Sequence, residues 1–308
     1  MFLTRELLEA KAPPFLPFYH TISNKHLPHI LNYPVISEKQ FKQELDFYLK
    51  YFQPISLEEL TKSPKPNSFH LSFDDGLKEC AEIAAPILLQ KGIPATFFVN
   101  SGFVDNKELF HRYKASLIAG EMRTRPDAEV ENYLYENEVP LNNILQVPFS
   151  KTDVLEHAAE LLEIDFQAFL QTHQPYMTTA QIKDLHKKGF SIGGHSHKHP
   201  EFWKISEKKQ LKHIKKSIKW VTENVNPKIK AFAFPYTDDG VSSKLINKIH
   251  ENELCAITFG TAGVKYDEIP HHFQRYPAEQ IGNFELNVKA EFLYFKLRQT
   301  IGKATVKH

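Results

Sequence analysis

The sequence predicts an α/β fold built from parallel strands. Near-continuous apolar runs, such as residues 93–100 and 231–236, are typical of strands that are covered on both faces. Between such runs lie segments of ten or more residues with apolar side chains at helical spacing, residues 207–224 being the longest. Strand, helix and strand in alternation indicate βαβ units and therefore a parallel sheet.

Seven apolar runs along the chain predict the strands. The first follows Pro13 and Pro14, and a brief extended piece at residues 54–55 precedes the second. The expected strands lie at residues 15–22, 70–73, 93–100, 190–194, 231–236, 255–259 and 273–276.

Helix signals fall between these strands. Capping-box patterns begin at Ser37, Ser56 and Thr178, where a Ser or Thr is followed three residues later by Gln or Glu. In the helix expected at residues 81–90, Pro86 should kink the helix or end its first turn, and Gly92 is a good C-cap. The other helices are expected to begin after the three capping boxes and to cover residues 207–224, 243–250 and 284–298.

The alternation is interrupted from about residue 104 to 175. This region has helical pieces at residues 109–118 and 154–170 around a polar, acid-rich middle at 125–142. We interpret residues 104–175 as a mostly helical insertion on a loop of a barrel. Loops at the carboxyl ends of barrel strands are where substrate selectivity tends to reside.

Composition excludes several classes of protein. The 308 residues are 42% hydrophobic and 24% charged with a net charge of +1, as in an ordinary soluble globular protein. The near-neutral charge gives no reason to expect a nucleic-acid or membrane partner. The two cysteines, Cys80 and Cys255, lie far apart, so no disulfide framework is implied.

The N-terminal stretch bears on location. Charges at Arg5, Glu6, Glu9 and Lys11 interrupt any apolar segment long enough for a signal peptide. No later segment approaches the roughly 20 apolar residues of a membrane span. We therefore expect a cytoplasmic protein without a transmembrane segment.

Two adjacent acids, Asp74 and Asp75, follow the expected strand at residues 70–73 and precede Gly76. Because the backbone turns where a strand ends, both carboxylates can reach one pocket. Two acids side by side are not buried and ionised without a compensating cation, and a metal ion is the obvious candidate. The alternative is a plain turn, since Asp and Gly are both turn formers.

The second half of a possible metal site is the stretch from His195 to Pro200. His195 and His199 are four residues apart after a strand, and one helical turn would place both imidazoles on the same side. Two neutral imidazoles and one carboxylate form a ligand set used by catalytic zinc sites. His197 should point elsewhere. The alternative is a surface turn rich in histidine. A metal site is favoured over this alternative because three histidines occur within five residues directly after an apolar strand.

These two stretches resemble the first two motifs of the polysaccharide deacetylases, the NodB-homology or carbohydrate esterase 4 group. Residues 72–76 read Ser-Phe-Asp-Asp-Gly, and residues 195–200 read His-Ser-His-Lys-His-Pro. Residues 18–20, 95–99 and 232–236 also look like the family. The resemblance covers most of residues 15–280 apart from the insertion.

The resemblance implies a distorted (β/α) barrel of seven or eight strands, with residues 1–308 as a single domain. It also implies roles for individual residues. Asp74 would be the general base. Asp75, His195 and His199 would bind one divalent metal ion, and zinc is the ion that we expect. The backbone N–H of Tyr236 would help to hold the oxyanion.

The implied activity is hydrolysis of a linear, non-peptide amide: removal of an N-acyl group, foremost N-acetyl, from an amino sugar or polysaccharide. Zinc lowers the pKa of a bound water to about 7, and Asp74 would take that water's proton. Two alternatives stay open. One is deacylation of a small or lipid-linked N-acyl compound, and the other is a non-catalytic carbohydrate-binding barrel.

The sequence departs from the family pattern in the third motif. Ala233 stands where the family has Arg, two residues before Pro235, and Arg275 is the candidate replacement for orienting Asp74. Pro235 would form a groove wall, and Pro235, Arg275 and His20 are candidates for substrate contact.

The family's late Leu-x-x-His motif, which provides the general acid, is not recognisable. The candidates for this role are His271 and His272, before the strand expected at 273–276, and His20, at the end of the first strand. Each is equally well explained as a structural or substrate-contacting histidine.

Overall fold

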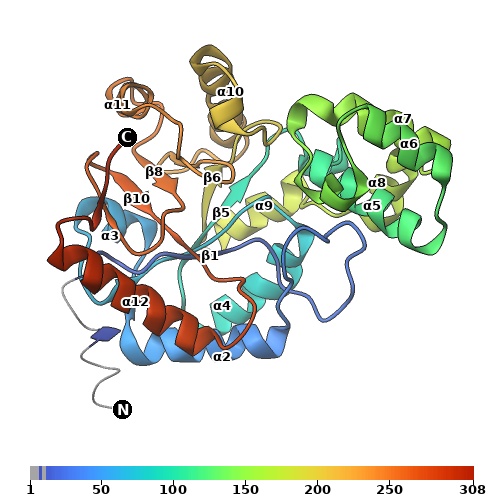
Figure 1. Ribbon diagram of the computed structural model, residues 1–308. Coiled ribbons are helices and arrows are strands. Elements are labelled where there is room, and N and C mark those ends of the chain that lie inside the picture. Colours follow the sequence, from blue (N-terminus) through green and yellow to red (C-terminus); the bar gives the residue numbers. More distant parts are fainter. Residues whose placement is uncertain (1–6, 9–11) are drawn as a thin grey trace.

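The computed structural model describes residues 7–8 and 12–308 and shows a barrel of parallel strands surrounded by helices (Figure 1). Eight strands pair in the order β10-β8-β7-β6-β5-β4-β1-β11, and every pair is parallel. Their bounds are β1 (Pro17–Tyr19), β4 (Leu71–Phe73), β5 (Ala95–Val99), β6 (Ser191–Gly194), β7 (Ala231–Ala233), β8 (Ile257–Gly260), β10 (His272–Gln274) and β11 (Tyr276–Pro277). The expected α/β barrel is confirmed.

The barrel is closed by one stretch of chain that pairs on both sides. β10 pairs with β8 and β11 pairs with β1, and Arg275 alone separates β10 from β11. The two edges of the sheet therefore meet in consecutive residues. The single strand expected at residues 273–276 is in fact two strands that end on opposite edges.

Helices cover the outside of the barrel in the expected alternation. Ser56 and Thr178 both form complete capping boxes, and the side chain of Ser37 accepts a hydrogen bond from the backbone N–H of Gln40. A π-helical turn, Cys80–Ala84, precedes the helix that carries Pro86, and Gly92 ends that helix in the left-handed conformation. The helices are α2 (Glu38–Tyr51), α3 (Leu57–Lys62), α4 (Ala85–Lys91), α9 (Thr179–Lys187), α10 (Glu207–Asn224), α11 (Ser243–Glu251) and α12 (Phe284–Thr300).

Between β5 and β6 the chain leaves the barrel and forms a helical lobe at one side (Figure 1). Its helices are α5 (His111–Thr124), α6 (Ala128–Glu136), α7 (Thr152–Leu161) and α8 (Phe166–His173). The polar, acid-rich middle, for which no helix was expected, contains α6, whose N-cap is the Asp127 side chain. The piece expected at 154–170 is two helices, because Glu163 adopts a left-handed conformation with φ +58° between them.

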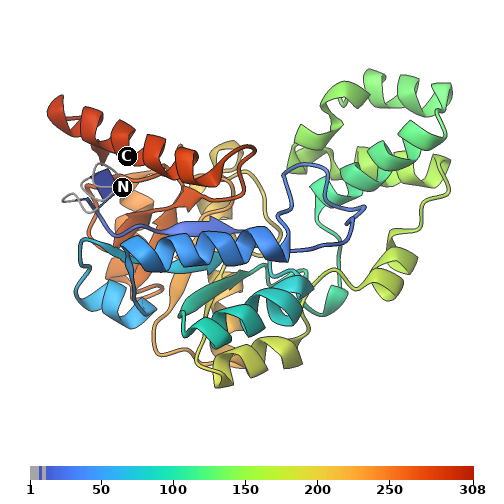
Figure 2. The ribbon, with the colours of Figure 1, turned by 90° about the horizontal axis from the view of Figure 1, so that it is seen from below.

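The loop between β1 and α2 reaches toward this lobe, as Figure 2 shows from below. The backbone N–H of Leu31 donates to Ser116 Oγ at 3.2 Å, and the hydroxyls of Tyr33 and Tyr113 lie 2.6 Å apart. Two segments far apart in sequence are therefore joined beside the barrel mouth.

The strands separate two buried apolar layers. Alternate side chains point inward, and in the barrel interior the ring centroids of Phe98 and Phe259 lie 5.4 Å apart. The opposite side chains pack under the helices, where Phe97 lies between Phe73, at 5.1 Å, and Phe190, at 5.2 Å. Two further small sheets, not expected from the sequence, pair β2 (Gln53–Pro54) with β3 (Ser68–Phe69) and β9 (Tyr266–Asp267) with β12 (Thr305–Val306).

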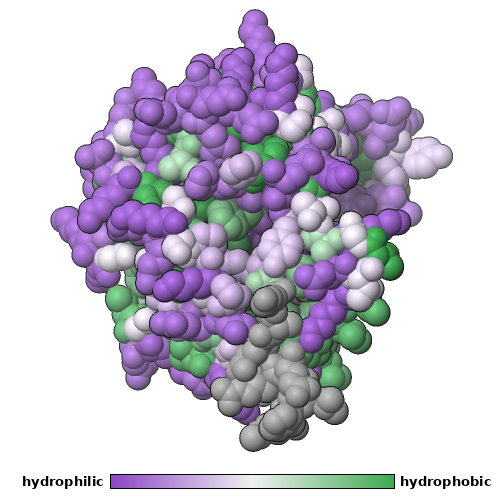
Figure 3. All heavy atoms as spheres, turned by 90° about the vertical axis from the view of Figure 1, so that its left-hand side faces the viewer, coloured by the Kyte–Doolittle hydropathy of each residue, from purple (hydrophilic) through white to green (hydrophobic). Residues whose placement is uncertain are grey.

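The molecular surface is largely hydrophilic on the face shown in Figure 3, with smaller hydrophobic patches between the polar side chains. Among the described residues, no helix has the length and apolar character needed to cross a membrane. The charged N-terminal stretch used for the expectation about a signal peptide lies, except for residues 7–8, outside the described residues.

We expect Phe97→Ala to lower the free energy of unfolding by about 3–5 kcal/mol. Phe97 is 0% exposed, and its removal leaves a cavity between two aromatic rings. Urea denaturation followed by circular dichroism measures the change. Tyr135→Ala, at a side chain that is 74% exposed, should change the same quantity by less than about 0.5 kcal/mol. Equal effects of the two substitutions would contradict this account of the core.

Candidate active site

A cluster of polar side chains lies at the carboxyl ends of the barrel strands. Its members follow β1 (His20), β4 (Asp74 and Asp75), β6 (His195 and His199), β7 (Tyr236), β10 (Arg275) and β11 (Glu279). The carboxyl end of a (β/α) barrel is where the loops of several strands converge on one site. The topology therefore brings together residues that lie up to 259 positions apart in sequence.

The two adjacent acids form a tight turn rather than continuing the strand. The backbone N–H of Asp74 donates to Tyr19 O at 2.8 Å and so stays in register with β1. Asp75 and Gly76 then both have positive φ, +69° and +71°, which reverses the chain. Asp is one of the few residues that tolerate this conformation. The turn brings Asp74 Oδ2 and Asp75 Oδ1 each to 3.7 Å from His195 Nε2, as the sequence predicted.

The two histidines meet through a loop, not through a helical turn. Residues 195–200 are not helical, and Ser196 and His199 have positive φ of +71° and +51°. The Ser196 side chain accepts a hydrogen bond from the backbone N–H of His199 at 2.9 Å and fixes the loop. The expectation of a helical turn was wrong, but its consequence holds, because the two Nε2 atoms lie 3.1 Å apart. His197 points away and contacts Ser101 Oγ at 2.9 Å.

Asp75, His195 and His199 form a group that could hold a metal ion. Their ligand atoms all lie within 4.8 Å of one another, and His199 Nε2 is 3.3 Å from Asp75 Oδ1. His195 Nδ1 lies 2.9 Å from the Ala233 carbonyl, to which it donates, so its Nε2 presents a lone pair to the site. Burial lowers the pKa of both imidazoles and keeps them neutral.

The unsatisfied atoms of this group fit a cation. Asp75 Oδ1 is buried and has no hydrogen-bond partner within residues 7–8 and 12–308, and burial raises the pKa of Asp75. Two neutral imidazole nitrogens and an unpartnered carboxylate oxygen that face one another need a positive charge between them. The residues present therefore fit a divalent ion with three protein ligands.

Arg275 holds Asp74 from inside the barrel. Its Nη1 donates to Asp74 Oδ1 at 2.7 Å and its Nη2 to Asp74 Oδ2 at 2.8 Å, and Nη1 also reaches Ser72 Oγ at 3.0 Å. Burial is the largest single effect and would raise the pKa of Asp74. The charge and hydrogen bonds of Arg275, together with His195 and His20, outweigh burial and lower that pKa below its ordinary value. Arg275 thus orients Asp74 and keeps it ionised, which is the role foreseen for a replacement of the missing third-motif Arg.

His20 is the candidate acid that the structure places at the cluster. Its Nδ1 lies 2.6 Å from Glu279 Oε2, its ring stacks on Tyr33 at 4.3 Å, and its side chain is 24% exposed. Burial by itself lowers the pKa of His20, but Glu279, with smaller contributions from Asp75 and Asp74, raises it to about 9. His20 is therefore a protonated, partly accessible imidazolium at neutral pH.

The other two candidate acids lie elsewhere. His272 has both ring nitrogens occupied, Nδ1 by Thr258 Oγ1 at 2.8 Å and Nε2 by Asp238 Oδ2 at 3.0 Å. His271 is exposed and lies before β10, at its amino end. Neither contacts the acids of the cluster.

Tyr236 forms one wall of the site. It has φ +60°, its carbonyl accepts a hydrogen bond from Thr261 Oγ1 at 2.9 Å, and its ring meets His199 edge-on at 4.5 Å. Pro235 lies beside it, and its carbonyl accepts a hydrogen bond from the backbone N–H of Thr237. The wall predicted from residues 235–236 therefore contacts the metal-ligand group directly.

Three residues of the site were missed in the sequence. Glu279 follows the last barrel strand, and its position after an apolar run was the only available signal. Tyr113 and Arg112 come from α5 in the lobe: the Tyr113 hydroxyl donates to Asp75 Oδ2 at 3.3 Å, and the Arg112 guanidinium lies 4.2 Å above the Tyr236 ring. Nothing in the sequence indicates that a helix of the lobe turns these side chains toward the barrel.

Comparisons with known proteins give the family and the fold of this chain. The family model described as polysaccharide deacetylase matches residues 61–138 and 152–255, more than half of the chain. Among solved structures, IcaB from Ammonifex degensii has 15% identity and a TM-score of 0.59, with 91% of this chain and 97% of that chain covered. The Streptococcus pyogenes deacetylase PplD, solved with acetate, has 15% identity and a TM-score of 0.57 over 91% and 98% of the two chains. A comparison with curated sequences finds no match.

We expect Arg275→Met to destabilise the protein by about 3–5 kcal/mol at neutral pH, because it leaves the Asp74 charge buried without a partner. The folded-state pKa of Asp74 is lowered, so the pair stabilises the fold above the ordinary Asp pKa of about 3.9 and ceases to do so as the pH falls through the folded-state value. The deficit of the variant should therefore be largest near pH 7 and should shrink below about pH 4.

Denaturation curves between pH 3.5 and 8 measure this difference. The double variant Arg275→Met with Asp74→Asn removes both charges and should recover part of the loss at pH 7. A deficit that is independent of pH, with no recovery in the double variant, would show that Arg275 acts through packing alone.

Proposed function

This chain belongs to the polysaccharide deacetylase family, and from that premise we propose that it is a metal-dependent hydrolase that removes N-acyl groups, foremost N-acetyl, from an amino sugar or its polymer. The observation that carries the proposal is the convergence of the metal-ligand group Asp75, His195 and His199 with an Asp74 carboxylate that Arg275 holds ionised. PplD, a deacetylase of similar fold, was solved with acetate, the carboxylate that deacetylation releases.

The metal ligands define what an ion would contribute. A divalent ion of the zinc class, held by Asp75, His195 and His199, would lower the pKa of a water molecule and polarise the acyl oxygen. Tyr113 donates to the other oxygen of Asp75 and fixes the direction of that ligand.

Asp74 is suited to remove the proton from the attacking water. Arg275 occupies one acceptor position on each of its oxygens, and an ionised carboxylate has about four such positions, so acceptor capacity remains. Asp74 Oδ2 also lies 3.7 Å from His195 Nε2, on the side of the metal-ligand group. The bidentate contact keeps this oxygen in place while it receives a proton.

His20 is suited to protonate the leaving nitrogen. It carries its proton at neutral pH, it is partly exposed, and Glu279 fixes the ring so that Nε2 is free to face the substrate. Asp74 and His20 thus have opposite protonation states, which is what base and acid roles in one reaction require. The backbone N–H of Tyr236 would help to hold the oxyanion.

The site also offers surfaces for a sugar. Trp203 is 42% exposed and its ring lies 5.7 Å from the Tyr236 ring, at the edge of the cluster. Ligand sites combine aromatic side chains with a few placed polar groups, and Trp203 offers such an aromatic surface to the sugar ring that we propose as substrate.

The direct test is acetate release from N-acetylglucosamine oligomers by the metal-loaded protein. We expect release by the wild type and a decrease in kcat of roughly 10²–10⁴-fold in Asp74→Asn, which removes the base. Asp46→Asn, at an exposed carboxylate paired with Lys91, is the matched control and should retain full activity. Oligomer binding without release by the wild type would favour a carbohydrate-binding barrel, and release only from small or lipid-linked N-acyl compounds would reassign the substrate.

The pH profile tests His20. An acid must be protonated, so activity should fall as the pH rises through the pKa of His20, which is about 9 in the wild type. Glu279→Gln removes the charge that raises this pKa and should move the basic limb of kcat/KM toward lower pH. An unmoved limb in Glu279→Gln, together with full activity in His20→Gln, would exclude His20 as the acid.

A further inference from the structure

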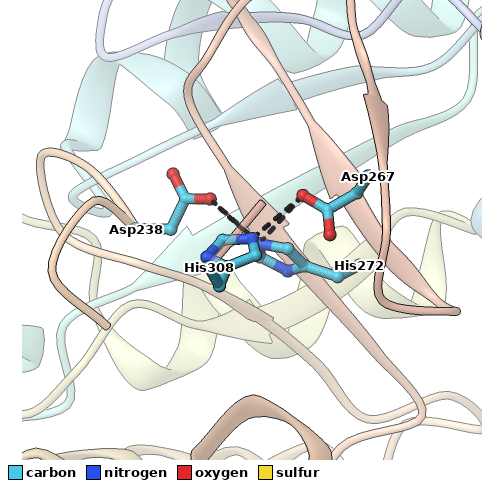
Figure 4. Close-up of side chains that lie close together, drawn as sticks. All are labelled: Asp238, Asp267, His272 and His308. Carbon is cyan, nitrogen blue, oxygen red and sulfur yellow. Dashed lines mark hydrogen bonds and ion pairs between the residues drawn. The ribbon is translucent and has the colours of Figure 1, made fainter. Parts of the chain in front are cut away.

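A second group of metal-ligating side chains lies outside the candidate active site. Asp238 follows β7, Asp267 ends β9, His272 begins β10, and His308 comes after β12. Figure 4 shows the two carboxylates turned toward each other with the two imidazole rings between them. The four side chains are only 0–3% exposed.

The distances within this group match those of the active-site group. His272 Nε2 lies 3.0 Å from Asp238 Oδ2 and 4.0 Å from Asp267 Oδ2, and His308 Nε2 lies 3.0 Å from Asp267 Oδ2 and 3.8 Å from Asp238 Oδ2. The corresponding separations among Asp75, His195 and His199 are 3.1, 3.3 and 3.7 Å. All four ligand atoms fall within 4.8 Å of one another.

We propose that Asp238, Asp267, His272 and His308 bind a second divalent cation of the zinc class in a closed, non-catalytic site. Two imidazoles and two carboxylates supply four ligands, the number of a structural zinc site, whereas the active-site group supplies three and leaves a position open. The two carboxylate charges balance those of a divalent ion while both imidazoles stay neutral. Without a cation, each Nε2 must instead carry a proton that it donates to a carboxylate.

The atoms that face away from the shared centre are held by neighbours. Asp238 Oδ1 accepts from the backbone N–H of Thr261 at 3.2 Å, and Asp267 Oδ1 accepts from that of Ile269 at 2.9 Å. His272 Nδ1 is fixed by Thr258 Oγ1 at 2.8 Å, which turns its Nε2 toward the carboxylates. Such outer contacts orient the ligands of metal sites.

Gln274 is the group that competes with a cation. Its Nε2 donates to Asp238 Oδ2 at 2.6 Å and to Asp267 Oδ2 at 2.8 Å, while its Oε1 accepts from the backbone N–H of Ala262. A ligating carboxylate oxygen can accept an N–H while it binds an ion through another lone pair. The alternative is a centre without an ion, in which Gln274 and the Nε2–H groups of the two imidazoles donate to the carboxylates.

The ligands of this second site are close in sequence to two residues of the active site. Asp238 comes two residues after Tyr236, and Gln274 immediately precedes Arg275. A cation here would tether the loop that carries Tyr236, strand β10, which ends one residue before Arg275, and β9 with its partner β12. Binding of the cation would position Tyr236 and also Arg275, which orients Asp74, and the cation itself would not contact the substrate.

Metal stoichiometry tests the proposal, because each site can be removed separately. Protein purified with zinc and dialysed should contain two ions per chain in the wild type, one in His199→Ala, one in His308→Gln and none in the double variant. His308→Gln retains an N–H that can donate to Asp267, so the fold is preserved while a ligand is lost. His271→Asn, at the exposed histidine next to His272, is the matched control and should retain both ions; Asn tolerates its φ of +61°.

Thermal unfolding gives a second measurement that does not depend on activity. Zinc added to metal-stripped His199→Ala should raise Tm, because an ion bound only by the folded state stabilises it, and should not raise Tm in His199→Ala with His308→Gln. A metal content of one in the wild type and none in His199→Ala, with no rise in Tm, would show that the four residues form a metal-free network. One ion in the wild type that only His308→Gln removes would instead support this site and contradict the proposed active-site metal.

Discussion

The ion pair between Arg275 and Asp74 connects the closure of the barrel to its chemistry. Arg275 is the one residue between β10 and β11, the strands that pair with opposite edges of the sheet. Because the chain changes partners at this point, the Arg275 side chain points into the barrel, where it lies 4.4 Å from the Phe18 ring and binds both oxygens of Asp74. A buried guanidinium is costly without a partner, so an ionised and aligned Asp74 stabilises the closed barrel.

The same constraint separates the two adjacent acids. Asp74 shares its environment with Arg275, which lowers its pKa, whereas burial raises the pKa of Asp75, whose Oδ1 has no hydrogen-bond partner among the described residues. The left-handed turn at Asp75 directs one carboxylate into the barrel and the other toward the histidines. Neighbours in sequence thereby have different surroundings, and these suit the two roles we propose for them, proton acceptor and metal ligand.

The rim of the site is assembled from segments that are not barrel strands. The loop after β1 carries Tyr33, the lobe carries Tyr113 and Arg112, and all three reach the cluster through contacts between aromatic rings, hydroxyls and the guanidinium. A change in the lobe can therefore reach the metal-ligand carboxylate through Tyr113. The lobe thus lies among the loops at the carboxyl ends of the strands, where selectivity in barrels usually resides.

The sequence by itself determined the parallel α/β class and the position of most barrel strands and of the helices around them. It also singled out five candidate residues that lie together in the structure: Asp74, Asp75, His195, His199 and Tyr236. These features depend on local periodicity, capping and short motifs, which are written in consecutive residues. Only the tertiary structure decided that β10 and β11 close the barrel at Arg275, that His20 rather than His271 or His272 lies at the site, and that Glu279 fixes it. It also brought His308 to Asp238. Such pairings join residues dozens to hundreds of positions apart, and they follow from the closure of the barrel and the packing of loops across its mouth, which no local pattern records.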